Sequence, residues 1–274
     1  MQKAAIPASP LAHSIATPSL VAQVMYQKFA MGLPLSRQEN DWYRLGLVLS
    51  RSNMANWVIR CSQDWLEPIY WRIHEKLLEC ELLHMDETRI QCNKEEGKLP
   101  SSDSFMWVMR SAASEKLQAA LFYYSRSRSS DNAKKLLDSY KGILITDAYA
   151  GYEKVPDIKR ALCWSHARRY LVDSIPLSNN YCEANIKPFA TARRAWLFAD
   201  TPRGAFANGV LYTLVESARA NKLDVYEYLK YLLSEMPNNH HQEDPTVIDR
   251  LLPWSEELPE QCRLKTRQKK CLKQ

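Results

Sequence analysis

The stretch LLHMDET, residues 82–88, places two acidic residues, Asp86 and Glu87, directly after a short apolar run. The composition of residues 81–92 predicts a β-strand whose apolar part ends at these acids. An acid at the end of a strand is often only a turn former. It can also be a metal ligand whose partners come from elsewhere in the chain, and LLHMDET alone leaves both readings open.

The segment GILITDAYAGY, residues 142–152, supplies a second strand with the same ending. Its Ile-Leu-Ile run at 143–145 is typical of a short strand buried on both faces, and Asp147 follows it. Between the two acidic strands, the sequence predicts strands at 104–112 and 117–126 and a helix at 129–140, and a fifth strand is expected at 160–164. Three successive strands and a helix that crosses to a fourth strand predict an RNase H-like mixed α/β sheet with flanking helices.

A helical region is predicted before the sheet, over residues 1–80. The motif SRQE, residues 36–39, has the form of a capping box, in which Ser36 and Glu39 satisfy each other's backbone N–H groups. One helix is expected to end near Gly46, and Ser50 can cap the next. The two short helices suggest a possible helix-turn-helix that reads DNA, although such pairs also occur in plain helical bundles.

The amino-acid composition limits the classes of protein to which this chain can belong. The chain has 274 residues, of which 46% are hydrophobic, enough for one sizeable core. Its apolar runs fall short of the roughly 20 residues that cross a bilayer, and prolines interrupt the first residues, so neither a membrane span nor a signal peptide is predicted. Seven irregularly spaced cysteines fit reduced thiols, which favours a cytoplasmic location.

The formal net charge is +6, and residues 262–274 alone hold six Lys/Arg and no acid. This basic end is either a solvated tail or a non-specific contact with phosphates. The expected organisation is a helical region at 1–80, an RNase H-like domain at 81–237 and a polar, then basic, C-terminal tail at 238–274.

Asp86 and Asp147 are expected to lie together, because the first and fourth strands are neighbours in an RNase H-like sheet. Two carboxylates that close repel each other, so the arrangement favours a divalent cation between them. A third carboxylate is needed for a two-metal site, and Glu183 in SNNYCEANIKPF, residues 178–189, is the candidate. Taken singly, each acid has a plainer explanation, as a turn former or a solvated helix residue.

Several motifs together resemble transposases of the insertion sequence 66 family. LLHMDET, LITDAYAGY, CWSHARR, NNYCEANIKPF and RRAWLF occur in the order found in that family, and the resemblance extends from about residue 18 to about residue 237. It implies an RNase H-like fold and a catalytic, metal-binding triad of Asp86, Asp147 and Glu183. The implied cofactor is Mg²⁺ or Mn²⁺, and the implied reaction is DNA cleavage at transposon ends followed by strand transfer.

The implied partners are transposon-end and target DNA and further copies of the chain assembled on DNA, with no membrane partner. Lys187, Arg193 and Arg194 follow Glu183 closely and could contact the DNA backbone, or could form a solvated basic helix face.

The chain also departs from the family pattern. The long insertion that normally follows CWSHARR is missing near residues 170–178, and Ser178 replaces the usual aspartate before the two asparagines. Two alternatives to an active transposase therefore stay open. One is an inactive, shortened remnant that binds DNA or an intact relative, and the other is a general RNase H-like nuclease.

Overall fold

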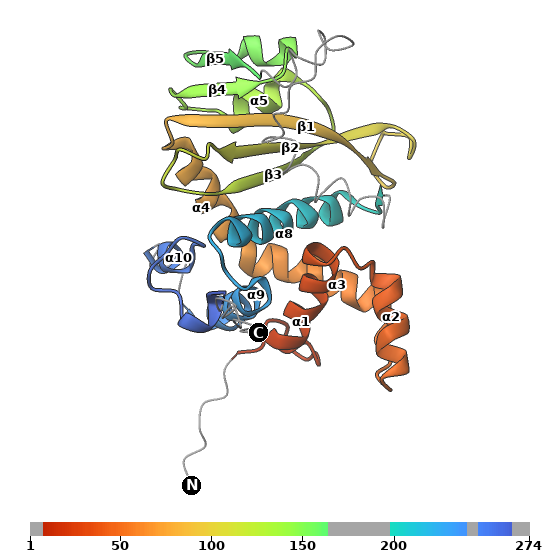
Figure 1. The fold of residues 1–274 in the computed structure, drawn as a ribbon. Coiled ribbons are helices and arrows are strands. Elements are labelled where there is room, and N and C mark those ends of the chain that lie inside the picture. The colour runs from red at the N-terminus through yellow and green to blue at the C-terminus, as the bar shows by residue number, and fades with distance from the viewer. Residues whose placement is uncertain (1–7, 164–197, 240–245, 265–274) are drawn as a thin grey trace, which may run out of the picture.

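The computed structural model describes residues 8–163, 198–239 and 246–264. A mixed β-sheet lies on one side of the molecule, and most of the helices form a layer beyond its β3 edge (Figure 1). The strand order is β3-β2-β1-β4-β5, with a short sixth strand beside the far end of β1. This order confirms the predicted RNase H-like fold.

The sheet pairs strands both ways. Antiparallel ladders join β1 to β2 and β2 to β3, and parallel ladders join β1 to β4 and β4 to β5. The strand bounds are Leu82–Cys92 for β1, Asp103–Ser111 for β2, Ala120–Ser125 for β3, Ile143–Thr146 for β4, Lys159–Leu162 for β5 and Phe198–Ala199 for β6. The predicted strands thus form, and the helix α5 (Ser130–Leu136) makes the crossover from β3 to β4.

The edge strand β3 is covered by the long helix α8 (Pro202–Ala220), which runs beside it in Figure 1. The hydroxyl of Thr213 accepts from the backbone N–H of Phe122 at 2.9 Å, and that of Ser217 accepts from Ala120 at 3.1 Å. Edge strands otherwise leave such groups unpaired and open to association with other chains. Gly209 faces the backbone of Phe122 so closely that a methyl group would have no room.

The N-terminal helices pack under α8 as one layer. They are α1 (Pro18–Met25), the π-helical turn η1 (Tyr26–Ala30), α2 (Leu35–Arg44), α3 (Arg51–Cys61), the π-helical turn η2 (Ser62–Leu66) and α4 (Glu67–Leu78). The predicted capping box is wrong, because the residue before α2 is Pro34 and not Ser36, two residues earlier than predicted, and Glu39 accepts from the N–H of Arg51 instead. Ser50 does cap α3, through the N–H of Asn53.

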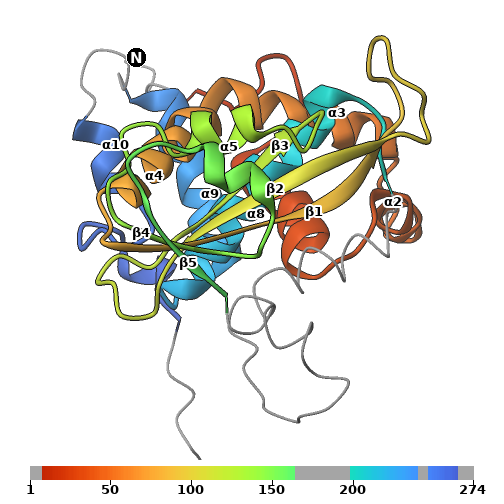
Figure 2. The same cartoon turned by 90° about the horizontal axis from the view of Figure 1, so that it is seen from above.

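One face of the sheet carries α5 and the 3-10 turn η3 (Ala150–Lys154), and Figure 2 shows α5 on that face. Trp107 of β2 is fully buried there and meets the ring of Tyr152 edge-on, with centroids 5.8 Å apart. This packing fixes the loop after β4 against the middle of the sheet, which matters for the acidic residues at the loop's start.

Part of the predicted C-terminal tail is packed. Helix α9 (Val225–Glu235), the turn η4 (Met236–Asn238), α10 (Thr246–Leu251) and the turn η5 (Glu260–Cys262) follow α8. Both carboxylate oxygens of Asp249 accept from the guanidinium of Arg72 in α4, at 2.6 and 2.8 Å. Cys262 is fully buried, so the packed part of the chain extends well beyond residue 238. None of the described helices has the length and apolar character to cross a membrane.

Candidate active site

Asp86 and Asp147 meet where β1 and β4 part. The parallel ladder between these strands ends at the pair His84 and Ile145, and each aspartate stands two residues further along its chain segment, Asp86 within β1 and Asp147 just after the end of β4. Carboxylate oxygens of Asp86 and Asp147 lie within 4.8 Å of each other. The two acids that sequence patterning singled out are therefore neighbours, one on β1 and one directly after the adjacent parallel strand β4.

A third carboxylate, that of Glu87, belongs to the same cluster. One oxygen from each of Asp86, Glu87 and Asp147 lies within 4.8 Å of the other two. Asp86 and Glu87 are consecutive residues of β1, so their side chains start from opposite faces of the strand. Both can turn around the strand edge towards Asp147, because the ladder to β4 has already ended. Sequence reasoning gave Glu87 no role, and its only signal was its position next to Asp86.

The Glu87 carboxylate is buried and has two partners. Its side chain is 1% exposed and forms an ion pair with Arg128 from the loop after β3. The hydroxyl of Tyr152 donates to Oε2 of Glu87 at 2.6 Å. Burial, and next the nearby charge of Glu87, raise the pKa of Tyr152 well above its usual value, so that the phenol stays a neutral donor. A buried carboxylate is thus stabilised by one cation and one hydroxyl.

Asp147 is oriented through both its side chain and its backbone. The N–H of Tyr149 donates to Oδ1 of Asp147 at 3.0 Å, and the guanidinium of Arg128 lies 3.5 Å from Oδ2. Arg160 of β5 donates to the carbonyl oxygen of Asp147 at 2.6 Å and to the hydroxyl of Thr146 at 2.9 Å. The turn after β4 therefore holds the Asp147 carboxylate towards β1.

His84 lies on the same face of β1 as Asp86, two residues before it. Its Nδ1 atom is buried and has no hydrogen-bond partner among the described residues. Burial, and next the charge of Arg110 on β2, lower the pKa of His84, which favours the neutral imidazole. The histidine adds an uncharged polar group beside the acidic cluster.

The donor set of the cluster fits a divalent cation such as Mg²⁺ or Mn²⁺. These cations prefer carboxylate oxygens, and close carboxylates repel each other unless a positive charge lies between them. Asp86 and Asp147 supply such oxygens from two strands, and Glu87 supplies a third.

The remaining predicted site residues lie outside the described part of the chain. They are Glu183, Lys187, Arg193 and Arg194. Their predicted roles, as the third catalytic carboxylate and as DNA contacts, stay predictions.

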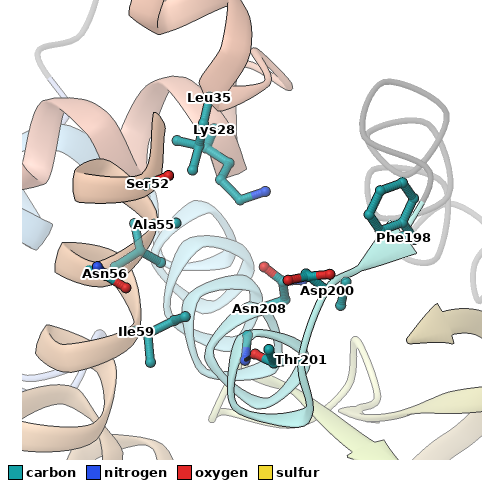
Figure 3. A pocket seen from close by; sticks show the side chains of 13 residues that line it. Lys28, Leu35, Ser52, Ala55, Asn56, Ile59, Phe198, Asp200, Thr201 and Asn208 are labelled. Carbon is teal, nitrogen blue, oxygen red and sulfur yellow. Dashed lines mark hydrogen bonds between the residues drawn. The ribbon is translucent and has the colours of Figure 1, made fainter. Parts of the chain in front are cut away.

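A separate pocket of about 320 Å³ lies between α3 and the segment that leads into α8. The side chain of Lys28 extends into it (Figure 3), and burial lowers the pKa of Lys28 to about 8. Asp200, which forms an ion pair with Lys94 at 2.7 Å, lines the opposite side. The pocket therefore presents both signs of charge. No sequence motif pointed to it.

Comparisons with known proteins identify a family to which this chain is similar. Residues 13–176 and 172–207 match the family model described as Transposase IS66 family, and residues 213–254 match the IS66 C-terminal element. The uncharacterized protein y4jD of Sinorhizobium fredii (strain NBRC 101917 / NGR234) is 28% identical over 193 residues, covering 66% of this chain and 37% of the relative. The uncharacterized protein y4hP of the same strain is 30% identical over 172 residues, covering 60% of this chain and 31% of the relative.

The chain thus spans about a third of the length of the curated relatives it matches. Among solved structures, it resembles the Drosophila P element transposase strand transfer complex, with a TM-score of 0.37 and 13% identity. That match covers 80% of this chain and 64% of the other.

Proposed function

The chain belongs to the IS66 family of transposases, and from this premise we propose that it cleaves and transfers DNA strands at transposon ends. The single observation that supports this most strongly is the meeting of Asp86 and Asp147 at the point where β1 and β4 part. Acidic residues so placed on two central strands can bind the metal on which such chemistry depends.

In the proposed site, Asp86 on β1 and Asp147 just after β4 would hold the metal, and Glu183 would complete the triad. When bound, Mg²⁺ or Mn²⁺ would activate the attacking oxygen and stabilise the leaving oxygen of a phosphodiester. Tyr149 and Arg160 keep Asp147 in place through its carboxylate and its carbonyl.

The proposed reaction has two phosphoryl transfers. In the first, a water oxygen attacks the phosphorus at the transposon end, and the bond to the 3′-oxygen breaks to give a free 3′-hydroxyl. In the second, that hydroxyl attacks a phosphodiester of the target DNA, which joins the two DNAs and releases a 3′-hydroxyl of the target.

DNA is the proposed partner, bound by several copies of the chain in the cytoplasm. Lys187, Arg193 and Arg194 are proposed to contact the DNA backbone near the site, and the basic end of the chain to add non-specific attraction. We further propose that residues 81–237 act as the catalytic domain and that the helical region of residues 1–80 contributes to DNA binding.

A second candidate is an inactive remnant that binds DNA or an intact relative. One observation favours it: the two stretches that match the family model meet at residues 172–176, in the short connector where an insertion was expected. The two candidates differ in whether the acidic residues support catalysis in this shortened chain.

The test is nicking of DNA that carries the element's terminal repeats, with Mg²⁺ or Mn²⁺. We expect metal-dependent nicking by the wild type and its loss in Asp147→Asn. The matched control is Asp138→Asn, at an exposed acid in the loop before β4, which should nick as the wild type does. DNA binding without nicking by the wild type would favour the remnant, and full activity of Asp147→Asn would reject the proposed site.

A further inference from the structure

We propose that Arg128 is a built-in competitor of the metal at this site, because its guanidinium takes the place beside Glu87 and Asp147 that a divalent cation would occupy. This inference rests on the proposed function, since it concerns the regulation of the same acidic cluster. It makes Arg128 and the metal alternative counterions of one set of carboxylates.

The position of Arg128 is the first argument. It comes from the short loop between β3 and α5 and forms an ion pair with Glu87. Its Nη2 atom also lies 3.5 Å from Oδ2 of Asp147. A single guanidinium therefore bridges two of the three clustered carboxylates.

The difference in exposure is the second argument. The Arg128 side chain is 42% exposed, whereas that of Glu87 is 1% exposed. Arg128 can therefore move into solvent, but Glu87 cannot. A buried carboxylate left without a cation is strongly unfavourable, since the hydroxyl of Tyr152 donates a hydrogen bond but brings no charge. When Arg128 leaves, a divalent cation is the available replacement.

Tyr149 supplies the third argument, because it contacts both Arg128 and Asp147. Its ring stacks on the guanidinium of Arg128, with the ring centre 4.0 Å from Cζ, and its hydroxyl donates to the Arg128 carbonyl. The N–H of the same residue donates to Oδ1 of Asp147. The residue that orients the metal ligand thus also holds the competing cation in place.

If Arg128 competes with the metal, removing it should raise the affinity for metal. Removing a residue with a purely structural role would lower that affinity. If Arg128 occupies the carboxylates in about nine-tenths of the molecules, the apparent Kd for metal is raised about tenfold. Arg128→Met should then bind Mn²⁺ about tenfold more tightly than the wild type, although it unfolds at a lower temperature without metal. A residue that merely braced the site would weaken Mn²⁺ binding when removed.

The experiment is calorimetric titration of the full chain with Mn²⁺ alone, together with thermal unfolding in EDTA and in Mn²⁺. The matched control is Arg160→Met, which removes a neighbouring arginine that donates to the backbone carbonyl of Asp147 and not to its carboxylate. Its Mn²⁺ affinity should be no tighter than that of the wild type. Adding Glu87→Gln to Arg128→Met should abolish the tenfold gain in Mn²⁺ affinity. An undiminished gain would overturn the claim that Glu87 pairs with the divalent cation once Arg128 has left.

A measurement on the wild type covers the case in which Arg128→Met does not fold. The Nε–H resonance of Arg128, assigned by its loss in Arg128→Lys, should shift as Mg²⁺ saturates the protein. An unchanged resonance at saturation, or weaker Mn²⁺ binding by Arg128→Met, would overturn the proposal.

Asp147→Asn separates this inference from the proposed function. We expect it to abolish Mn²⁺ binding, and wild-type binding by that variant would reject the acidic site itself. If Asp147→Asn abolishes binding and Arg128→Met does not tighten it, the competition is refuted while the proposed site stands.

Discussion

Replacing Gly209 by alanine should destabilise the protein, although alanine is the better helix former. Gly209 lies in the middle of α8, where the helix runs against the edge strand β3. A Cβ atom built on Gly209 would lie 2.4 Å from the carbonyl oxygen of Phe122, and Cβ contacts below 3.0 Å essentially do not occur. The obstacle is backbone and not a flexible side chain, so the helix and the strand must separate.

The size of the loss in stability follows from the distances between α8 and β3. Widening the contact from 2.4 to 3.0 Å requires α8 to move by about 0.6 Å. That movement stretches the bonds from Thr213 and Ser217 to the β3 backbone, which start at 2.9 and 3.1 Å. Overpacking costs about 1–3 kcal/mol and each weakened bond about 1 kcal/mol, while the gain in helix propensity returns about 1 kcal/mol. We expect a net loss of about 2–4 kcal/mol, or roughly 3–7 °C in Tm for a chain of this length.

The assay is urea unfolding followed by circular dichroism and tryptophan fluorescence. The matched control is Gly204→Ala in the first turn of the same helix, where the nearest atom to the added Cβ would be 3.4 Å away. That variant should be unchanged or more stable by up to about 1 kcal/mol. Wild-type stability of Gly209→Ala would refute the reasoning, because it would show that α8 does not depend on a close approach to β3.

Three further predictions concern buried polar groups. Tyr152→Phe should lower the free energy of unfolding by about 1–3 kcal/mol in urea titrations, because the buried carboxylate of Glu87 loses a hydrogen bond. Lys28→Met should raise it by about 1–3 kcal/mol at pH 7, because burial lowers the Lys28 pKa to about 8 and charged lysine is disfavoured in the folded state. That penalty is complete below pH 8 and fades as the pH rises towards 10.5, so only the wild type should gain stability from Lys28 over that range. Cys61, whose thiol pKa is raised by burial to about 12, should stay unalkylated by iodoacetamide in the native protein, while the half-buried Cys163 reacts, as peptide mass spectrometry can show.

Each of these has a contradicting result. Tyr43→Phe, at an exposed tyrosine, should leave stability unchanged, and an equal loss in both tyrosine variants would argue against the Glu87 hydrogen bond. Equal stability of wild type and Lys28→Met at pH 7 would show that the charged lysine is well solvated. Alkylation of Cys61 at the rate of a peptide thiol would show that the helical layer opens readily.

Some of this protein can be derived from local sequence patterns. The short apolar runs that end at Asp86 and Asp147 predicted two central strands, and the succession of three strands, a helix and a fourth strand predicted the RNase H-like sheet. The helices around Gly46 were predicted as well, but the predicted capping box is wrong, because Glu39 accepts from the backbone N–H of Arg51 in the next helix. Patterns of this kind succeed because side-chain periodicity and chain order are local properties that the sheet preserves.

Tertiary structure alone decided what surrounds the two aspartates. Glu87, Arg128 and Tyr152 converge from a strand, a loop and a turn that are separated by up to 65 residues, and no spacing in the sequence relates them. The adjacency of Asp86 and Glu87 indicated charge, but not that Glu87 would be buried with an arginine as its partner. Such contacts depend on where β1 parts from β4 and on how the turn after β4 packs on Trp107. They are set by packing between distant segments, which determines whether a charged side chain meets water or a counterion.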